Sequence, residues 1–173
     1  MFDYFIHNNT NFLFRDIYAD DYHKNYIQLM STLSVVNPSN ISFDEFKSFI
    51  SELNQKHRIY VIEDITQNEI VASITVLYET KIIHDLGKVC HIEDVVVSPK
   101  MQGYGFGLFM IDKIKTHNKD CYKIILDCSE PIAGFYEKCG FSAKGIQMAI
   151  YKSGETPSEE TPEPPIRSRE NNP

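Results

Sequence analysis

Three glycines fall within five residues of the chain, and the segment that holds them, Gln102–Gly107, constrains the fold more than any other feature. It lies between an apolar run that ends near Ser98 and a helical pattern that begins near Phe106. Because glycine tolerates positive φ angles, the backbone can turn tightly here and direct several N–H groups toward one point. That point lies at a helix N-terminus, which favours an anion. A glycine-rich connector without a ligand is the alternative.

The segment matches neither of two common phosphate-binding loops. A Walker loop requires Gly-Lys followed by Ser or Thr, and this pattern does not follow here. A dinucleotide-binding fingerprint follows the first strand of its fold, whereas several expected strands precede this segment. The spacing to the third glycine also differs from that fingerprint. A pyrophosphate cradle of a different kind is therefore predicted.

The hydrophobic pattern predicts an α/β (α+β) fold with a mixed, mainly antiparallel central sheet flanked by helices. Residues 42–45 read Ser-Phe-Asp-Glu, a capping box that starts a helix. β-branched and aromatic runs on both sides of residues 64–69 indicate a hairpin, and later strand–helix–strand crossovers add parallel pairing. Strands are expected at 11–17, 58–63, 70–78, 89–97, 122–128 and 142–151, and helices at 20–33, 42–53, 106–116 and 132–139.

Composition excludes several classes of protein. The net charge of −7 disfavours a nucleic-acid backbone as partner, which would require a basic face. The absence of any run of about 18 apolar residues argues against a membrane span, and the first residues lack the features of a signal peptide. A zinc site from His84, Cys90 and His91 is not expected, because strand neighbours point to opposite faces. We expect a cytoplasmic protein with reduced thiols and no metal.

The chain is expected to hold one domain, residues 1–152, followed by a tail, residues 153–173. The tail contains five of the eight prolines, five Glu, two Arg and no aromatic residue. Such a segment cannot bury enough apolar area to offset its ordering entropy, so it is expected to be disordered.

Several segments resemble known acetyltransferases. Gln102–Gly107 fits the pattern Q-x-x-G-x-G and resembles the acetyl-CoA pyrophosphate loop of the GNAT superfamily. The segments His91–Val97, Cys121–Cys128 and Phe135–Phe141 resemble glucosamine-6-phosphate N-acetyltransferases, as does the sugar-phosphate segment Lys81–Gly87. The resemblance is strong from residue 81 to residue 150 and weak before it.

The resemblance implies a homodimeric GNAT enzyme that transfers acetyl from acetyl-CoA to the 2-amine of glucosamine 6-phosphate. The product, N-acetylglucosamine 6-phosphate, leads to UDP-N-acetylglucosamine. The positions that match acetyl-CoA contacts are Glu93, Asp94, Val95, Met101, Gln102, Gly103, Tyr104, Gly105, Phe106, Gly107, Gly134, Phe135 and Tyr136. Those that match sugar-phosphate contacts are Ser34, Lys81, Ile82, Ile83, His84, Asp120, Cys121, Lys123 and Lys152.

Acetyl transfer needs a base for the amine and an acid for the CoA thiolate. Glu93 and Asp94 are adjacent, so a regular strand would point them to opposite faces. A bulge would re-aim one carboxylate and free backbone N–H groups for the thioester oxygen. We expect Glu93 to remove the amine proton, directly or through water, Asp94 to shape the amine site, and Tyr136 to protonate the thiolate. Alternatively, Asp94 satisfies local hydrogen bonds and Tyr136 is a core aromatic.

The chain departs from the family pattern at three places. Ser34-Val-Val-Asn37 stands where the family usually has Thr-Thr-Val-Gly, so Ser34 keeps the hydroxyl but Asn37 replaces the glycine. Tyr151 stands where the family has an arginine for the phosphate, and Lys152 follows it. The link before Cys121 is shorter, which puts the contacts from that loop in doubt.

Two other functions fit parts of the pattern. Another GNAT enzyme, acting on a protein N-terminus, a polyamine or a different amino sugar, would share only the CoA loop. A non-catalytic acyl-CoA-binding or dimerisation module would fit loss of the carboxylates and the tyrosine, but Glu93, Asp94 and Tyr136 are all present.

Overall fold

The computed structural model describes residues 2–150 of the chain. The chain divides into two compact units, Met1–Leu126 and Asp127–Pro173, which are taken in turn. Lys152 and the expected tail, residues 153–173, lie outside the described residues.

The first unit contains a six-stranded sheet in which the strands lie in the order of the sequence. Pairing is antiparallel from the first strand to the fifth, and the last pair is parallel. This arrangement is the mixed, mainly antiparallel sheet that the sequence predicts. The strands are β1 (Phe2–His7), β2 (Thr10–Asp16), β3 (His57–Asp64), β4 (Glu69–Thr80), β5 (Lys88–Val97) and β6 (Cys121–Ile125).

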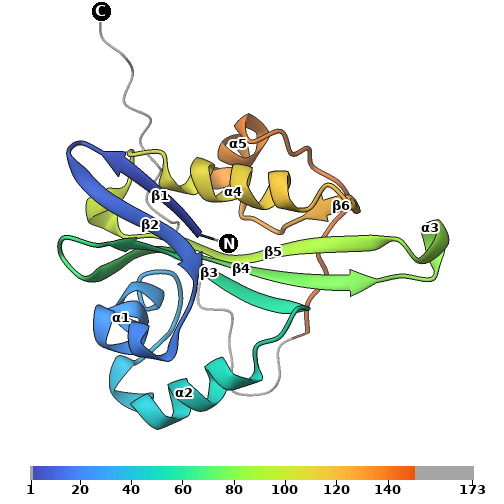
Figure 1. The fold of residues 1–173 in the computed structure, drawn as a ribbon. Helices are drawn as coiled ribbons and strands as arrows, with labels where there is room; N and C mark the ends of the chain where they lie inside the picture. The colour runs from blue at the N-terminus through green and yellow to red at the C-terminus, as the bar shows by residue number, and fades with distance from the viewer. Residues whose placement is uncertain (1, 151–173) are drawn as a thin grey trace, which may run out of the picture. The chain divides into compact units, whose positions relative to one another are not determined.

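Helices cover both faces of this sheet. Figure 1 shows α1 (Tyr26–Met30) and α2 (Phe43–Glu52) against one face and α4 (Phe106–His117) against the other. Helix α2 begins at the predicted capping box, where the Ser42 N–H donates to the Glu45 carboxylate at 2.8 Å. Shorter helical turns complete the unit: η1 (Ala19–Lys24), η2 (Pro38–Asn40), α3 (Ile83–Leu86) and η3 (Pro99–Met101).

The sheet therefore has an apolar core on each side. On the α4 side, the rings of Phe12 and Phe106 meet edge to face with their centroids 4.9 Å apart. On the α1–α2 side, Tyr26 and Phe46 pack with ring centroids 5.5 Å apart, in a cluster that includes Val61 of β3. This apolar packing fixes α4 on one face of the sheet and α1 and α2 on the other.

The predicted helix at 20–33 is wrong as a continuous element. The structure contains a 3-10 turn, η1, and the five-residue helix α1, which are separated at Asn25 with φ 63°. Asparagine adopts this left-handed conformation more readily than most residues, so the chain can change direction there. The spacing of apolar residues that suggested one helix runs through both η1 and α1.

Strand β1 has no counterpart among the expected elements. It is an edge strand, and alternate side chains (Phe2, Tyr4 and Ile6) are exposed. Its inward side chain Phe5 packs on Phe109 of α4 with ring centroids 4.5 Å apart. The strand therefore extends the core on the α4 side.

A buried ion cluster joins β2, η1 and β3 on the α1–α2 side. The Arg15 guanidinium donates to both oxygens of Asp21, at 2.6 and 2.7 Å, and to Glu63 at 2.6 Å. Lys24 also donates to Glu63, at 2.6 Å. Burial opposes ionisation of Glu63, yet the hydrogen bonds from Lys24 and Arg15 hold its pKa below the ordinary value. The stability that ionised Glu63 contributes through these hydrogen bonds is therefore lost as the pH falls through its lowered pKa.

Arg15→Ala is expected to lower the free energy of unfolding by about 3–5 kcal/mol, because it leaves two buried carboxylates without their shared cation. Arg58→Ala, which removes the partner of the more exposed Asp16, is the matched control and should cost about 1 kcal/mol or less. Urea unfolding of both variants measures the difference. Equal losses would show that the buried cluster contributes no more than a surface pair.

Candidate active site

The glycine-rich segment forms the predicted turn in front of α4. Gly103 and Gly105 have φ angles of 81° and 82°, and Gly105 is the N-cap residue of α4. These left-handed conformations strain any residue with a side chain. A Cβ placed on Gly105 would meet no atom within 4 Å, so open space adjoins the turn. Open space thus adjoins the N-terminus of α4, the end of a helix that favours an anion, which fits a pyrophosphate.

Neighbouring side chains hold this turn in place. The Gln102 side chain approaches the carbonyl of Val97 at 3.5 Å, which ties the turn to the end of β5. The ring of Tyr104 meets His7 of β1 edge to face, with centroids 5.1 Å apart. Met101 ends the short turn η3, and Phe106 and Gly107 open α4 as buried residues. Sequence reasoning did not anticipate the contribution of β1, because an edge strand with exposed aromatic residues gives a weak pattern.

The expected bulge is present in β5 beside the two carboxylates. Thr75 of β4 pairs with Glu93 and Ser73 pairs with Val96, so three steps along β5 match two steps along β4. Asp94 has φ 46° and is exposed, whereas Glu93 is half-buried. The bulge therefore changes the direction of the strand at the two residues for which the sequence predicts chemistry.

The parallel pairing between β5 and β6 ends early. The last paired residues are His91 and Ile125, so beyond His91 no strand of the described chain pairs with this edge of β5. Backbone groups of Glu93, Asp94 and Val95 lie on the segment that continues past this point. An open strand edge of this kind can donate hydrogen bonds to the oxygen of a thioester.

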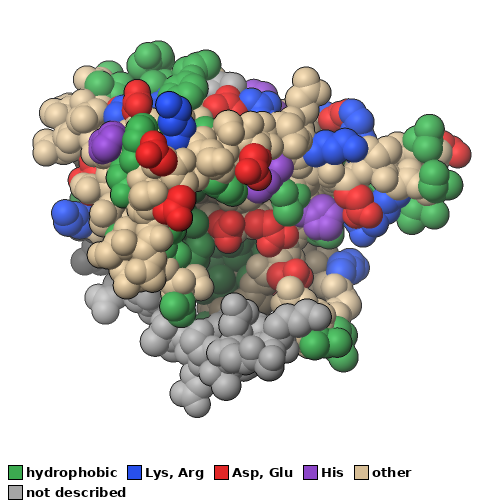
Figure 2. All heavy atoms as spheres, turned by 90° about the horizontal axis from the view of Figure 1, so that it is seen from below, with side chains coloured by type: hydrophobic (Ala, Val, Ile, Leu, Met, Phe, Trp, Pro, Cys, Tyr) green, Lys and Arg blue, Asp and Glu red, His purple; other side chains and the backbone are tan. Residues whose placement is uncertain are grey.

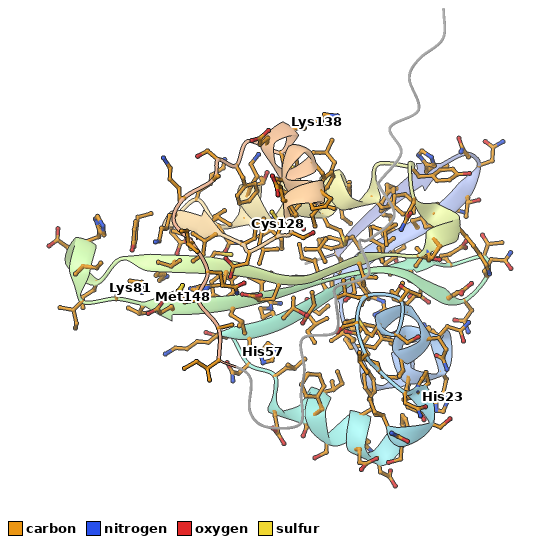
Figure 3. All side chains as sticks on the ribbon, turned by 180° about the vertical axis from the view of Figure 1, so that it is seen from behind. His23, His57, Lys81, Cys128, Lys138 and Met148 are labelled. Atoms are coloured by element: carbon orange, nitrogen blue, oxygen red, sulfur yellow. The ribbon has the colours of Figure 1, made fainter. Side chains whose placement is uncertain are left out.

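Seven of the predicted sugar-phosphate residues, all except Ser34 and Lys152, belong to segments at the opposite end of β5. Lys81, which is labelled in Figure 3, follows β4. Its N–H donates to the carbonyl of Gly87 at 2.9 Å across the end of the hairpin. The His84 ring lies on Tyr122 with centroids 4.1 Å apart, and Tyr122 lies between Cys121 and Lys123 on β6. Asp120 accepts from Lys88 at 2.8 Å.

The Lys81 side chain at this end of the hairpin is already engaged by a carboxylate. The Lys81 ammonium donates to Glu79 at 2.6 Å, and the same carboxylate lies 3.3 Å from His91. The hydrogen bond from Lys81 lowers the pKa of Glu79. Ile82 and Ile83 are exposed and offer side chains without charge. A phosphate would therefore have to compete with Glu79 for Lys81.

Ser34 belongs to a different part of the unit. It lies in the turn after α1, where its N–H donates to the carbonyl of Met30 at 3.3 Å, and its side chain is exposed. Figure 2, seen from the side that carries α1 and α2, shows acidic side chains gathered near the middle of that face. An acidic face suits an acceptor that arrives as an ammonium ion.

The second unit contains the predicted thiolate-side residues on α5 (Glu130–Lys138). Gly134, Phe135 and Tyr136 are consecutive in this helix, and the Tyr136 ring meets Phe135 at 5.0 Å between centroids. Gly140, with φ 90°, follows the helix as predicted.

The predicted strand at 142–151 is wrong for its described part. Residues 142–150 form no strand, although Ile146, Met148 and Ile150 alternate as a strand pattern requires. All three side chains are exposed. Alternation indicates which side chains could share a face, but a strand also needs a backbone partner, and none is present among the described residues.

The described residues also bear on a metal site and on a membrane span. Residues 2–150 hold no group of three or more His, Cys, Asp or Glu side chains arranged to bind a metal ion. In the same range, no helix is both long enough and apolar enough to cross a membrane.

Comparison with known proteins assigns this architecture. The model of the acetyltransferase (GNAT) domain matches residues 55–143. Glucosamine 6-phosphate N-acetyltransferase 1 of Dictyostelium discoideum is 38% identical over 140 residues, which cover 80% of this chain and 89% of that protein. The chain belongs to the glucosamine 6-phosphate N-acetyltransferase family. The Arabidopsis thaliana member is 38% identical over 143 residues, which cover 81% of this chain and 96% of that protein.

A crystal structure of the Arabidopsis thaliana member of this family supports the assignment. It matches with a TM-score of 0.76 at 37% identity and covers 81% of this chain and 97% of that chain. Membership confirms the predicted GNAT fold and the prediction of an acetyltransferase that uses acetyl-CoA as cosubstrate. The roles of individual site residues stay predictions.

Proposed function

We propose that this chain transfers the acetyl group of acetyl-CoA to the 2-amine of glucosamine 6-phosphate and releases N-acetylglucosamine 6-phosphate and CoA. The proposal is supported by sequence similarity to glucosamine 6-phosphate N-acetyltransferases over about four fifths of the chain. The reaction belongs to UDP-N-acetylglucosamine biosynthesis, and we place it in a cytoplasmic homodimer.

In the proposed mechanism the transfer is direct, within one ternary complex. The amine nitrogen attacks the thioester carbon, the C–S bond breaks, and the acetyl group moves without an enzyme-bound intermediate. Glu93 takes the proton that the ammonium group must lose, directly or through one water molecule. Backbone N–H groups at the bulge stabilise the negative oxygen of the tetrahedral intermediate. Asp94 orients the amine.

The CoA thiolate also needs a proton in this proposal. CoA leaves most easily when its sulfur is protonated, and Tyr136 is the candidate donor. Gly134 and Phe135 approach the same sulfur through their backbone. The segment Met101–Gly107 holds the pyrophosphate of acetyl-CoA at the N-terminus of α4, where the turn and the open space beside Gly105 suit it.

The sugar phosphate is held by the residues at the end of the β4–β5 hairpin. Lys81, His84 and either Lys123 or Lys152 supply the cationic or hydrogen-bonding groups, some of them from the second protomer of the proposed dimer, and Lys152 stands in for the family's arginine. Lysine contributes a point charge, not the two parallel hydrogen bonds of arginine. Ser34, Ile82, Ile83, Asp120 and Cys121 complete the proposed sugar-phosphate site.

A four-acceptor assay tests this function against its alternatives. The protein is mixed with acetyl-CoA and, separately, with glucosamine 6-phosphate, glucosamine, a polyamine or a peptide with a free N-terminus, and CoA release is followed with a thiol reagent. Mass spectrometry of the sugar product confirms N-acetylation. Turnover mainly with a polyamine or a peptide would assign a different GNAT activity. Binding of acetyl-CoA without turnover of any acceptor would indicate a binding module.

We also propose that residues 1–152 form the acetyltransferase domain and that residues 153–173 have no part in it. Ending the chain after Lys152 is expected to leave the melting temperature and kcat nearly unchanged, because the removed segment has no aromatic residue and only one aliphatic side chain, Ile166, for packing. Differential scanning fluorimetry and the CoA-release assay measure both quantities. A drop of several degrees would contradict this boundary.

A further inference from the structure

A buried tyrosine beside the bulge has no part in the mechanism above. Tyr26 of α1 is 4% exposed and belongs to the same hydrophobic cluster as Val96 of β5. Val96 is two residues beyond Asp94, and α1 packs against both β4 and β5. A tyrosine buried to this extent normally directs its hydroxyl group toward a polar partner.

Ser73 provides a second, independent observation at the same place. It lies on β4 directly opposite Val96, and its side chain is fully buried. Its Oγ has no hydrogen-bond partner of acceptable geometry among the described residues. The Tyr26 hydroxyl is a polar neighbour of this oxygen. A buried hydroxyl without a partner is rare in native proteins and calls for a structural explanation.

The charges of two carboxylates, Asp94 and Asp21, act on the Tyr26 hydroxyl, and the two groups differ in whether their oxygens are already engaged. Burial, against the opposing effect of the nearby Ser73 hydroxyl, raises the pKa of Tyr26 to about 12, and the charges of Asp94 and Asp21 add to the rise. Tyr26 therefore keeps its proton at neutral pH and can act as a donor. Both oxygens of Asp21 already accept from Arg15. The exposed carboxylate of Asp94 is the acceptor that this donor can orient.

We infer that Tyr26 is a positioning residue for acyl transfer: its hydroxyl, backed by that of Ser73, donates to the Asp94 carboxylate and holds it in the orientation that receives the acceptor amine. The inference rests on the proposed role of Asp94 in the amine site. Asp94 is exposed and lies in a bulge, so its side chain has several rotamers unless a partner selects one. Ser73 gains its missing partner when its hydroxyl donates to the oxygen of Tyr26.

Tyr26→Phe tests this role with little change in packing. Loss of a hydrogen bond to a charged group is expected to lower kcat/KM for glucosamine 6-phosphate by about 10- to 100-fold. The KM for acetyl-CoA should not change, because Tyr26 does not contact the glycine-rich turn in this proposal. Tyr22→Phe is the matched control, since its hydroxyl donates at 2.8 Å to the carbonyl of Ile41, outside the site. Equal losses in the two variants would overturn the inference.

A double-mutant cycle separates positioning from a general loss of stability. Asp94→Gly removes the carboxylate and keeps the positive φ without strain. If Tyr26 acts through Asp94, adding Tyr26→Phe to Asp94→Gly should change kcat/KM by less than about twofold. A loss as large as in the wild-type background would show that Tyr26 acts independently of Asp94 and would refute the proposal. Ser73→Ala should reproduce part of the Tyr26→Phe effect.

A measurement without substrate distinguishes failure of this inference from failure of the proposed function. In protein labelled at the ring carbon that bears the hydroxyl, the NMR signal of Tyr26 is the one absent in Tyr26→Phe. Asp94→Gly is expected to shift that signal at neutral pH, and Tyr22 should be unaffected. An unchanged signal would overturn the inference. A shifted signal in a protein that does not acetylate glucosamine 6-phosphate would instead leave the contact established and remove the proposed substrate.

Discussion

Tyr136→Phe is expected to lower kcat by about 10²–10⁴-fold, the range typical of acid–base residues. The substitution keeps the aromatic ring and its contact with Phe135, but it removes the proton that the departing thiolate would receive. Acetyl-CoA affinity should be unchanged, because the hydroxyl proton is needed by the thiolate that forms during transfer and not by the intact thioester. Steady-state turnover and isothermal titration with acetyl-CoA measure the two quantities.

The design of this test must separate chemistry from product release. Single-turnover mixing of enzyme–acetyl-CoA with excess glucosamine 6-phosphate reports the chemical step directly. Tyr4→Phe is the matched control, because Tyr4 is exposed on the edge strand β1. A single-turnover rate in Tyr136→Phe equal to that of the wild type would exclude Tyr136 as the acid.

Glucosamine without its phosphate is expected to be a very poor acceptor, with the loss mainly in kcat/KM. The chain has a net charge of −7, so cations must be gathered locally to bind a phosphate. Each charge-assisted phosphate contact contributes roughly a tenfold to a hundredfold gain. Comparison of kcat/KM for the two sugars measures the combined effect of the contacts at the end of the hairpin.

Lys81→Ala should narrow the difference in kcat/KM between the two sugars, because it should lower the value for glucosamine 6-phosphate and leave the value for glucosamine unchanged. The variant also releases one oxygen of Glu79 from its 2.6 Å ion pair, while the other oxygen still lies 3.3 Å from His91. Lys115→Ala, on the surface of α4, serves as the control for a change in net charge. If kcat/KM for glucosamine were within a few-fold of the value for glucosamine 6-phosphate, the proposed substrate would be wrong. The family assignment would stand.

The elements with strong local signals agree with their sequence-based predictions. Helix α2 begins at Ser42 because the capping box satisfies its own backbone groups, and this information lies within four residues. The β3–β4 hairpin follows from alternation and from the polar residues between its strands. The break at Asn25 and the edge strand β1 depend on packing against distant residues, so a local pattern could not reveal them.

The features of the candidate site also differ in whether the local sequence could predict them. The glycine turn before α4 and the bulge at Glu93 and Asp94 could be predicted, because each needs a particular kind of residue at a particular position. The buried partners near the bulge could not be predicted: Tyr26 and Ser73 are 47 positions apart in the sequence, and neither belongs to a motif. Likewise, Arg15 and Glu63 are 48 residues apart, so only the folded sheet brings them together.

The positive φ of Asp94 restricts how this position can evolve. Aspartate, asparagine and glycine tolerate the left-handed region, whereas a β-branched residue there would be strained by roughly 1–3 kcal/mol. Of the three tolerated residues, only aspartate carries a charge. A lineage that loses the carboxylate can therefore keep the bulge through Asn or Gly and later regain the acid by a single substitution, whereas replacement by Val or Ile would disturb the backbone on which the neighbouring Glu93 depends.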